Sequence, residues 1–192
     1  MKKKNKDRFQ IGVMGSAGNI CTRKGYKCAY EVGKEIAKAG HILVTGGGHG
    51  VMEGASKGAY DAGGLVVGIL PGAMKEEANR YCDIIIPTGI GFARNLMNIQ
   101  SSHGIIIVEG GVGTLTEAAY AYTNQTPAVA FVGSGGTADK LAGKTMDVRE
   151  LETIVPGFNA KDCVQKVVKL IKHHKVKLLK YTVDMKNNYK SD

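Results

Sequence analysis

Three glycine clusters contain the residues of this chain that are best suited to hold a phosphate group. Each cluster follows a short apolar run and precedes a segment of helical periodicity. Glycine lets backbone N–H groups approach an anion closely, and the helix that follows adds unpaired N–H groups and a partial positive charge. The residues expected to bind phosphate are Gly15, Ser16 and Ala17 in the first cluster, Gly46, Gly47 and Gly48 in the second, and Gly110, Gly111, Val112, Gly113 and Thr114 in the third.

Two charged side chains, Arg94 and Glu117, are placed to act on the rest of such a ligand. Arg94 stands near the start of a predicted helix and shares a helix face with Asn98, four residues on. Its planar guanidinium suits a phosphate or a ring carbonyl. Glu117 stands near the start of the helix after the third cluster, where a carboxylate can accept hydrogen bonds from ribose hydroxyls or stabilise positive charge on a sugar ring.

The spacing of Thr114 and Glu117 also has a purely structural interpretation. Thr-x-x-Glu at a helix start is a capping box, in which the two side chains satisfy free backbone N–H groups. A capping glutamate would face its own helix end and not a ligand. The sequence leaves both interpretations open.

The clusters differ from the common nucleotide-binding motifs. None reads G-x-G-x-x-G, and the chain has no G-x-x-x-x-G-K-[ST] P-loop. A nicotinamide dehydrogenase or an ATPase is therefore disfavoured. The four cysteines and five histidines form no metal-ligand pattern, so we expect reduced thiols, no metal site and no required cofactor.

Short apolar runs alternate with helix-period segments, which is the pattern of βαβ units and a parallel sheet. The expected strands are residues 10–14, 41–45, 65–70, 83–87, 104–108 and 128–132, with a weaker candidate at 153–155. The expected helices are a crossover helix that ends before Gly40, then residues 51–62, 92–102, 115–123, 137–141 and 162–174. The runs lack polar alternation, so helices should cover both faces. We predict a three-layer, Rossmann-like α/β fold with a mostly parallel sheet of about six or seven strands and the glycine clusters along its carboxyl edge.

The net charge of +9 belongs to the ends of the chain. Residues 1–8 and 172–192 carry +4 each, which leaves +1 for residues 9–171. We predict one domain over residues 9–174 between basic tails at residues 1–8 and 175–192, with Val183–Met185 as a candidate edge strand. A nearly neutral body disfavours nucleic acid as a partner. No apolar run has the length of a membrane span or a signal peptide, so we expect a cytoplasmic protein without a membrane partner.

Three segments in this order and spacing resemble a known superfamily: Gly46-Gly47-Gly48-His49-Gly50-Val51-Met52, Phe92-Ala93-Arg94-Asn95 and Gly110-Gly111-Val112-Gly113-Thr114-Leu115-Thr116-Glu117. The superfamily contains the LOG-type nucleoside 5′-monophosphate phosphoribohydrolases and the molybdenum-cofactor carrier proteins. The resemblance covers about residues 9–171. It implies a Rossmann-like homo-oligomer, a dimer or a tetramer, that binds a small phosphorylated ligand over the first and third glycine clusters.

The resemblance implies two alternative functions. In the hydrolases the arginine and glutamate of these motifs, here Arg94 and Glu117, are the catalytic pair that releases a free base and ribose 5-phosphate. This chain departs from them, because Glu109 stands where they usually have proline and Asn95 where they usually have lysine. The Arg-Asn pair is more similar to the carriers. The sequence therefore favours a nucleotide or pterin-phosphate binding protein, with a nucleoside monophosphate or molybdopterin as its ligand, and a phosphoribohydrolase is the alternative.

Overall fold

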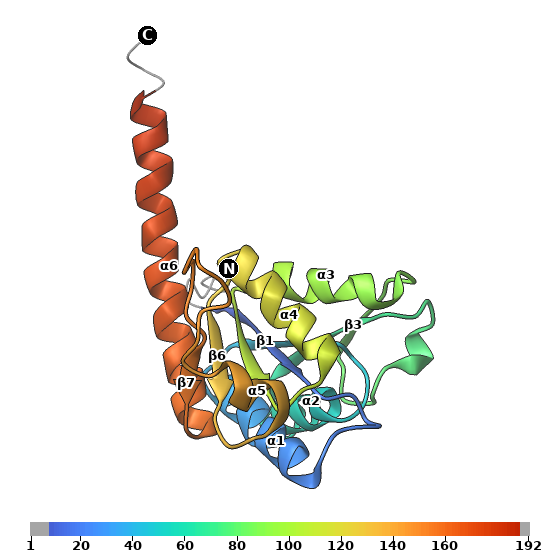
Figure 1. The fold of residues 1–192 in the computed structure, drawn as a ribbon. Coiled ribbons are helices and arrows are strands. Elements are labelled where there is room, and N and C mark those ends of the chain that lie inside the picture. The colour runs from blue at the N-terminus through green and yellow to red at the C-terminus, as the bar shows by residue number, and fades with distance from the viewer. Residues whose placement is uncertain (1–7, 189–192) are drawn as a thin grey trace.

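The computed structural model describes residues 8–188 of the chain, and their side chains as far as residue 174. Seven strands form one sheet in the order β4-β3-β2-β1-β5-β6-β7, and every neighbouring pair is parallel (Figure 1). The strands are β1 (Gln10–Gly15), β2 (Ile42–Thr45), β3 (Leu65–Leu70), β4 (Ile84–Pro87), β5 (Gly104–Val108), β6 (Ala128–Phe131) and β7 (Val155–Gly157). The helices are α1 (Arg23–Lys38), α2 (Val51–Asp61), α3 (Arg94–Gln100), α4 (Val112–Thr123), α5 (Gly136–Leu141) and α6 (Ala160–Asn188), with short 3₁₀ turns η1 (Lys75–Glu77) and η2 (Gly91–Ala93).

Helices cover both faces of the sheet, as the unbroken apolar runs predicted (Figure 1). On one face, Ile11 and Val13 of β1 are buried in a core with residues of α1, α2 and α6. On the other face, Met14 is buried with Ile99 of α3 and with residues of α4 and α5. Alternate residues of one strand thus enter two different cores, which is the geometry of the three-layer Rossmann-like fold.

The order of the strands creates a switch point between β1 and β5. The chain first adds β2, β3 and β4 on one side of β1, and then returns to place β5 on the other side. Open parallel sheets bind ligands at such a point, outside the carboxyl ends of the strands, because the loops there diverge. The first glycine cluster follows β1 and the third follows β5, so these two clusters flank the switch point. The second cluster follows β2, one strand away.

The structure corrects the sequence analysis at two helices. α4 begins at Val112 and not at residue 115, so the end of the third glycine cluster is already helical. α6 continues to Asn188, so residues 175–188 of the predicted basic tail are helical. Val183–Met185 lie in this helix, and the predicted edge strand there is wrong. No glycine or proline follows Gly157, so nothing in the sequence ends the helix earlier.

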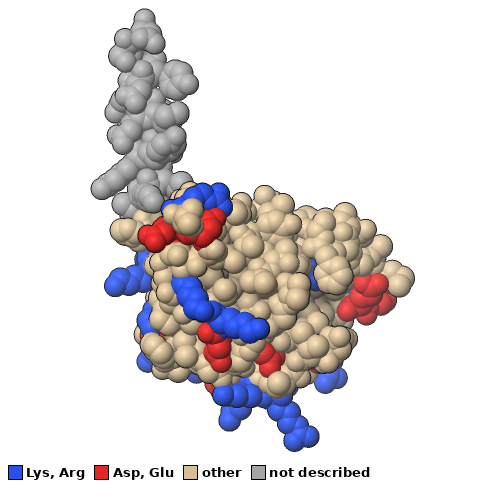
Figure 2. Space-filling view, viewed as in Figure 1, with Lys and Arg blue, Asp and Glu red and all other residues tan. Residues whose placement is uncertain are grey.

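The described part of the chain has a mixed surface. On the face shown in Figure 2, Lys and Arg are interspersed with Asp and Glu over a mostly uncharged surface. This agrees with the near-neutral charge of residues 9–171. Within residues 8–188, no helix is long and apolar enough to cross a membrane.

Candidate functional site

A pocket of about 240 Å³ lies at the switch point between β1 and β5. It is lined by predicted ligand-binding residues from both flanking clusters and by the two charged side chains. These predicted residues are Gly15, Ser16, Ala17, Arg94, Gly111, Gly113, Thr114 and Glu117. Residues that are far apart in the sequence are therefore brought together here.

The other predicted residues lie around the pocket without lining it. Asn98 lies behind Glu117, and its Nδ2 donates to Glu117 Oε1 over 3.0 Å. Gly110 donates its backbone N–H to Ser16 Oγ over 2.9 Å, which ties the third cluster to the first. Val112 is 80% exposed and does not line the pocket. The second cluster, Gly46, Gly47 and Gly48, directly follows the neighbouring strand β2 and does not line the pocket.

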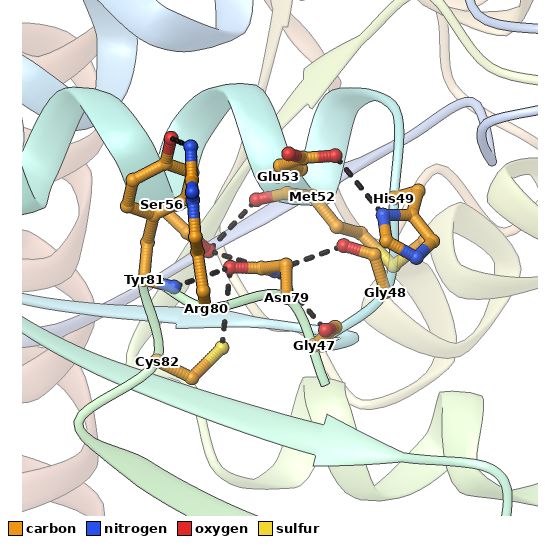
Figure 3. Close-up of polar contacts among 10 residues, drawn as sticks. All are labelled: Gly47, Gly48, His49, Met52, Glu53, Ser56, Asn79, Arg80, Tyr81 and Cys82. Carbon is orange, nitrogen blue, oxygen red and sulfur yellow. Dashed lines mark hydrogen bonds and ion pairs between the residues drawn. The ribbon is translucent and has the colours of Figure 1, made fainter. Parts of the chain in front are cut away.

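The second glycine cluster is held by Asn79, which sequence analysis missed (Figure 3). The buried Asn79 Nδ2 donates to the carbonyl oxygens of Gly47 and Gly48 over 3.0 and 2.9 Å, and the Asn79 backbone N–H donates to Gly47 over 2.8 Å. The cluster in turn adjoins Arg94, because a Cβ atom at Gly46 would overlap Arg94 Nη1. Within this arrangement, the glycine at position 46 makes room for the guanidinium.

Glu117 faces the pocket and does not cap its helix. Gly111 is the N-cap of α4, with no side-chain capping bond, and Thr114 is the third helical residue. Glu117 therefore lies in the second turn, where it is only 6% exposed and bonded to Asn98. Burial raises the pKa of Glu117 to about 7, although the hydrogen bond from Asn98 and the charge of Arg94 lower it. The capping interpretation is wrong because the helix begins three residues earlier than expected.

Arg94 is a buried cation at the start of α3. It is 7% exposed, and its Nε has no hydrogen-bond partner among the described residues. Burial lowers its pKa, while the negative charge of Glu117 raises it. No ion pair joins Arg94 to Glu117 among the described residues. Both groups line the pocket, so each can contact a polar ligand bound there.

Glu109, which directly follows β5, is hydrogen-bonded to the start of α1. It has a positive φ of 54°, and its Oε1 accepts hydrogen bonds from the Thr22 backbone N–H and Oγ1 over 3.2 and 2.6 Å. Thr22 is the N-cap of α1, so a carboxylate of the chain itself already occupies this helix terminus. An incoming anion is therefore directed to α4, whose first turn has no capping side chain.

Five further residues that sequence analysis did not select line the pocket: Asn19, Ile20, Met52, Phe92 and Asn95. Asn95 is one of them, and its Nδ2 donates to the Gly113 carbonyl over 3.4 Å. The Phe92-Ala93-Arg94-Asn95 segment was a signal for it.

A larger hollow of about 510 Å³ is lined by Arg23, Tyr26, His49 and Glu53 among others, but it contains neither Arg94 nor Glu117. Among the described residues, no group of three His, Cys, Asp or Glu could hold a metal ion, and the four cysteines are free.

The arrangement can hold an anion at the start of α4 and has two opposite charges for the remainder of the ligand. A seven-stranded parallel sheet with a pocket at its switch point defines the class of Rossmann-like proteins. Within this class, the chain belongs to the SLOG cluster4 family, whose model matches residues 8–156. The superfamily resemblance found in the sequence is confirmed.

Solved structures of high similarity include two proteins whose names refer to the molybdenum cofactor. The molybdenum cofactor binding protein of Rippkaea orientalis is 35% identical with a TM-score of 0.72, and the match covers 85% of this chain and 98% of that one. The Moco carrier protein of Chlamydomonas reinhardtii is 34% identical with a TM-score of 0.74, and the match covers 86% of this chain and 99% of that one.

Curated proteins with similar sequences include a hydrolase. An uncharacterized protein of Archaeoglobus fulgidus is 50% identical over 113 residues, which are 59% of this chain and 73% of that protein. The cytokinin riboside 5′-monophosphate phosphoribohydrolase of Mycobacterium tuberculosis is 37% identical over 99 residues, which are 50% of this chain and 53% of that protein. The chain thus matches about half the length of this hydrolase.

Proposed function

We propose that this chain binds a small phosphorylated ligand, a nucleotide or a pterin phosphate such as molybdopterin, in the manner of the molybdenum-cofactor carriers. The observation that carries the proposal is the pocket at the switch point, which joins the uncapped first turn of α4 to the buried Arg94 and Glu117. The phosphate lies against the backbone of Gly111, Gly113 and Thr114. Arg94 and Glu117 then orient the remainder of the ligand.

Two further points support a carrier-like function. Phe92 is 84% exposed at the pocket, which provides an apolar surface for a planar ring. The similar Rippkaea and Chlamydomonas proteins match along nearly their whole length and carry molybdenum-cofactor names. No cofactor is required for such a function, since the ligand is the cargo.

A thermal-shift panel tests this proposal. Nucleoside monophosphates and molybdopterin are compared with the same compounds without phosphate. A ligand at about 100 times its dissociation constant stabilises the fold by roughly 2.7 kcal/mol, which is about 5–10 °C for a chain of this size. Native mass spectrometry then identifies a phosphorylated ligand that copurifies. If no phosphorylated compound raises Tm above its dephosphorylated counterpart, the proposal fails.

The second candidate is a nucleoside 5′-monophosphate phosphoribohydrolase. It is favoured by one observation, that Arg94 and Glu117 line the same pocket. An ionised Glu117 would stabilise the oxocarbenium-like sugar and help to position water, while Arg94 would anchor the substrate. This function predicts release of a free base from a monophosphate, and the release disappears in Glu117→Gln. A broad monophosphate panel without base release removes this candidate.

We also propose that the chain forms a homo-oligomer and remains in the cytoplasm. Large apolar side chains are exposed beside the pocket at Ile20, Phe92, Val112 and Leu115, which is typical of an interaction surface. Light scattering at micromolar concentrations measures the oligomeric state, and a mass of 20.4 kDa throughout would contradict it.

A further inference from the structure

The contact with Glu117 explains which way the side-chain amide of Asn98 is turned. Asn98 is fully buried, and its Nδ2 donates to Glu117 Oε1 over 3.0 Å. Its Oδ1 is buried and has no hydrogen-bond partner among the described residues. An unpaired buried acceptor destabilises the fold, so the hydrogen bond of Nδ2 to Glu117 has to offset that cost. Turning the amide over would bring two acceptors together for as long as Glu117 is ionised.

In the described part of the chain, only one charged side chain acts on Glu117 besides its hydrogen bond from Asn98. The elements packed against α4 are α3, α5, β1, β5 and β6. Their charged side chains are Arg94 on α3 and Asp139 and Lys140 on α5. Asp139 is exposed and accepts hydrogen bonds from backbone N–H groups of its own loop, and Lys140 is exposed. Arg94 is therefore the charge that acts on Glu117, and it forms no ion pair with it among the described residues.

We propose that Asn98 is a positioning residue that favours the ionised form of Glu117 and leaves one carboxylate oxygen to accept a hydrogen bond from the ligand. This inference rests on the proposed function of the pocket and narrows its ligand class. The bound molecule has to present an O–H or N–H donor, such as a sugar hydroxyl or a pterin N–H, at the wall opposite its phosphate. Ligand binding is then linked to loss of a proton from Glu117.

Burial of Glu117 determines whether ligand affinity rises or falls with pH. Because burial raises the pKa of Glu117 to about 7, the carboxyl group gains a proton as the pH falls through neutrality, and it then loses the acceptor that the ligand needs. Affinity should therefore be roughly tenfold weaker at pH 6 than at pH 8. A hydrogen bond to a charged group is worth about 1.5–3 kcal/mol, so removing the Asn98 donor should raise the pKa by about one unit or more.

The first test needs no ligand. Carbon-13 NMR follows the Glu117 side-chain carboxyl in the full chain, and spectra of Glu117→Gln assign its signal. We expect the carboxyl to titrate at least one pH unit higher in Asn98→Leu than in the wild type. Asn98→Asp retains the size of the side chain and also raises the titration, because two carboxyl groups then compete for one proton. The control is Thr116→Val on the exposed face of α4, which should titrate like the wild type. Unchanged titration in Asn98→Leu overturns the proposal, whatever the result for Asn98→Asp.

The second test uses AMP as the probe over pH 6–8. The wild type should lose about tenfold in affinity towards pH 6, and Asn98→Leu should lose affinity already near pH 8. Glu117→Gln should keep only the weaker pH dependence that comes from the phosphate of AMP, whose second pKa is about 6. AMP binding that does not depend on pH or on Asn98 overturns the proposal. If AMP does not bind but the Glu117 carboxyl titrates higher in Asn98→Leu, the role of Asn98 is supported and the proposed nucleotide ligand fails. The failure of this inference and the failure of the proposed function are therefore distinguishable.

Discussion

The substitution Gly46→Ala should separate ligand binding from stability. Gly46 has no positive φ, so alanine fits its backbone conformation. A Cβ atom there would overlap Arg94 Nη1 and would lie 3.0 Å from Arg94 Cζ and 2.5 Å from Met52 Sδ. These neighbours are the far ends of flexible side chains. The fold can therefore accept the methyl group, but the guanidinium has to move.

The size of the effect follows from these distances. Non-bonded heavy atoms prefer a separation of about 3.5–4.0 Å, and Nη1 is the atom that the new methyl group overlaps, so the guanidinium must shift by more than about 1 Å. A charge-assisted hydrogen bond from Arg94 to a ligand is worth about 1.5–3 kcal/mol, and its loss weakens binding by about 10–100-fold. The free energy of unfolding should change by less than about 1 kcal/mol, because no buried backbone group loses its partner.

Calorimetric titration with the ligand found in the thermal-shift panel, together with urea denaturation, measures both quantities. The matched control is Gly48→Ala in the same cluster, whose Cβ would lie 3.2 Å from Met52 Cε and would not reach Arg94. It should bind like the wild type. Equal affinities of Gly46→Ala and the wild type would show that Arg94 does not contact the ligand and would refute this account of the second cluster.

Three other substitutions test the electrostatics and the loop contacts. The pKa of Glu117 is raised from 4.5 to about 7, so the folded state binds this proton more tightly than the unfolded state does. The free energy of unfolding of the wild type, relative to Glu117→Gln, should therefore fall by up to about 3 kcal/mol as the pH rises from 4.5 to 7. Denaturation curves that give the same difference between the two proteins at pH 5 and at pH 8 would contradict this. Asn79→Ala should lower the free energy of unfolding by about 1–3 kcal/mol, because the Gly48 carbonyl loses its donor and the Gly47 carbonyl keeps only the backbone N–H of position 79. The exposed neighbour Arg80→Ala should change it by less than about 0.5 kcal/mol in the same urea experiment. Glu109→Ala should cost about 1–3 kcal/mol by removing the acceptor for Thr22, and Glu109→Gln, which retains one oxygen, should cost less. Thermal denaturation with equal Tm values for the wild type and both variants would show that this contact does not stabilise the start of α1.

The layers of the fold could be predicted from the sequence because apolar runs without polar alternation require cover on both faces. Residues 65–70 and 104–108 were expected as strands with the bounds that the structure gives them. The order of the strands could not be derived from the pattern. It depends on the return of the chain to the free side of β1, and this return decides that the second glycine cluster lies one strand away from the pocket. The resemblance to the superfamily had already favoured the first and third clusters.

The candidate site was predictable as a set of residues but not as a geometry. Whether Glu117 caps its helix depends on a difference of three residues at the start of α4, and glycine-rich helix starts give little local signal for their first turn. Asn79 could not be recognised, because its role comes from contacts with a cluster about thirty residues earlier in the chain. Its segment carries no motif that predicts these contacts. Cytoplasmic location and the absence of a metal remain predictions.

The position of the phosphate in a liganded crystal structure tests the central claim most directly. With AMP or molybdopterin bound, the account predicts phosphate oxygens within hydrogen-bond distance of the backbone N–H groups at the start of α4, with Arg94 and Glu117 facing the remainder of the ligand. A phosphate in the larger hollow lined by Arg23, Tyr26 and His49 would contradict it.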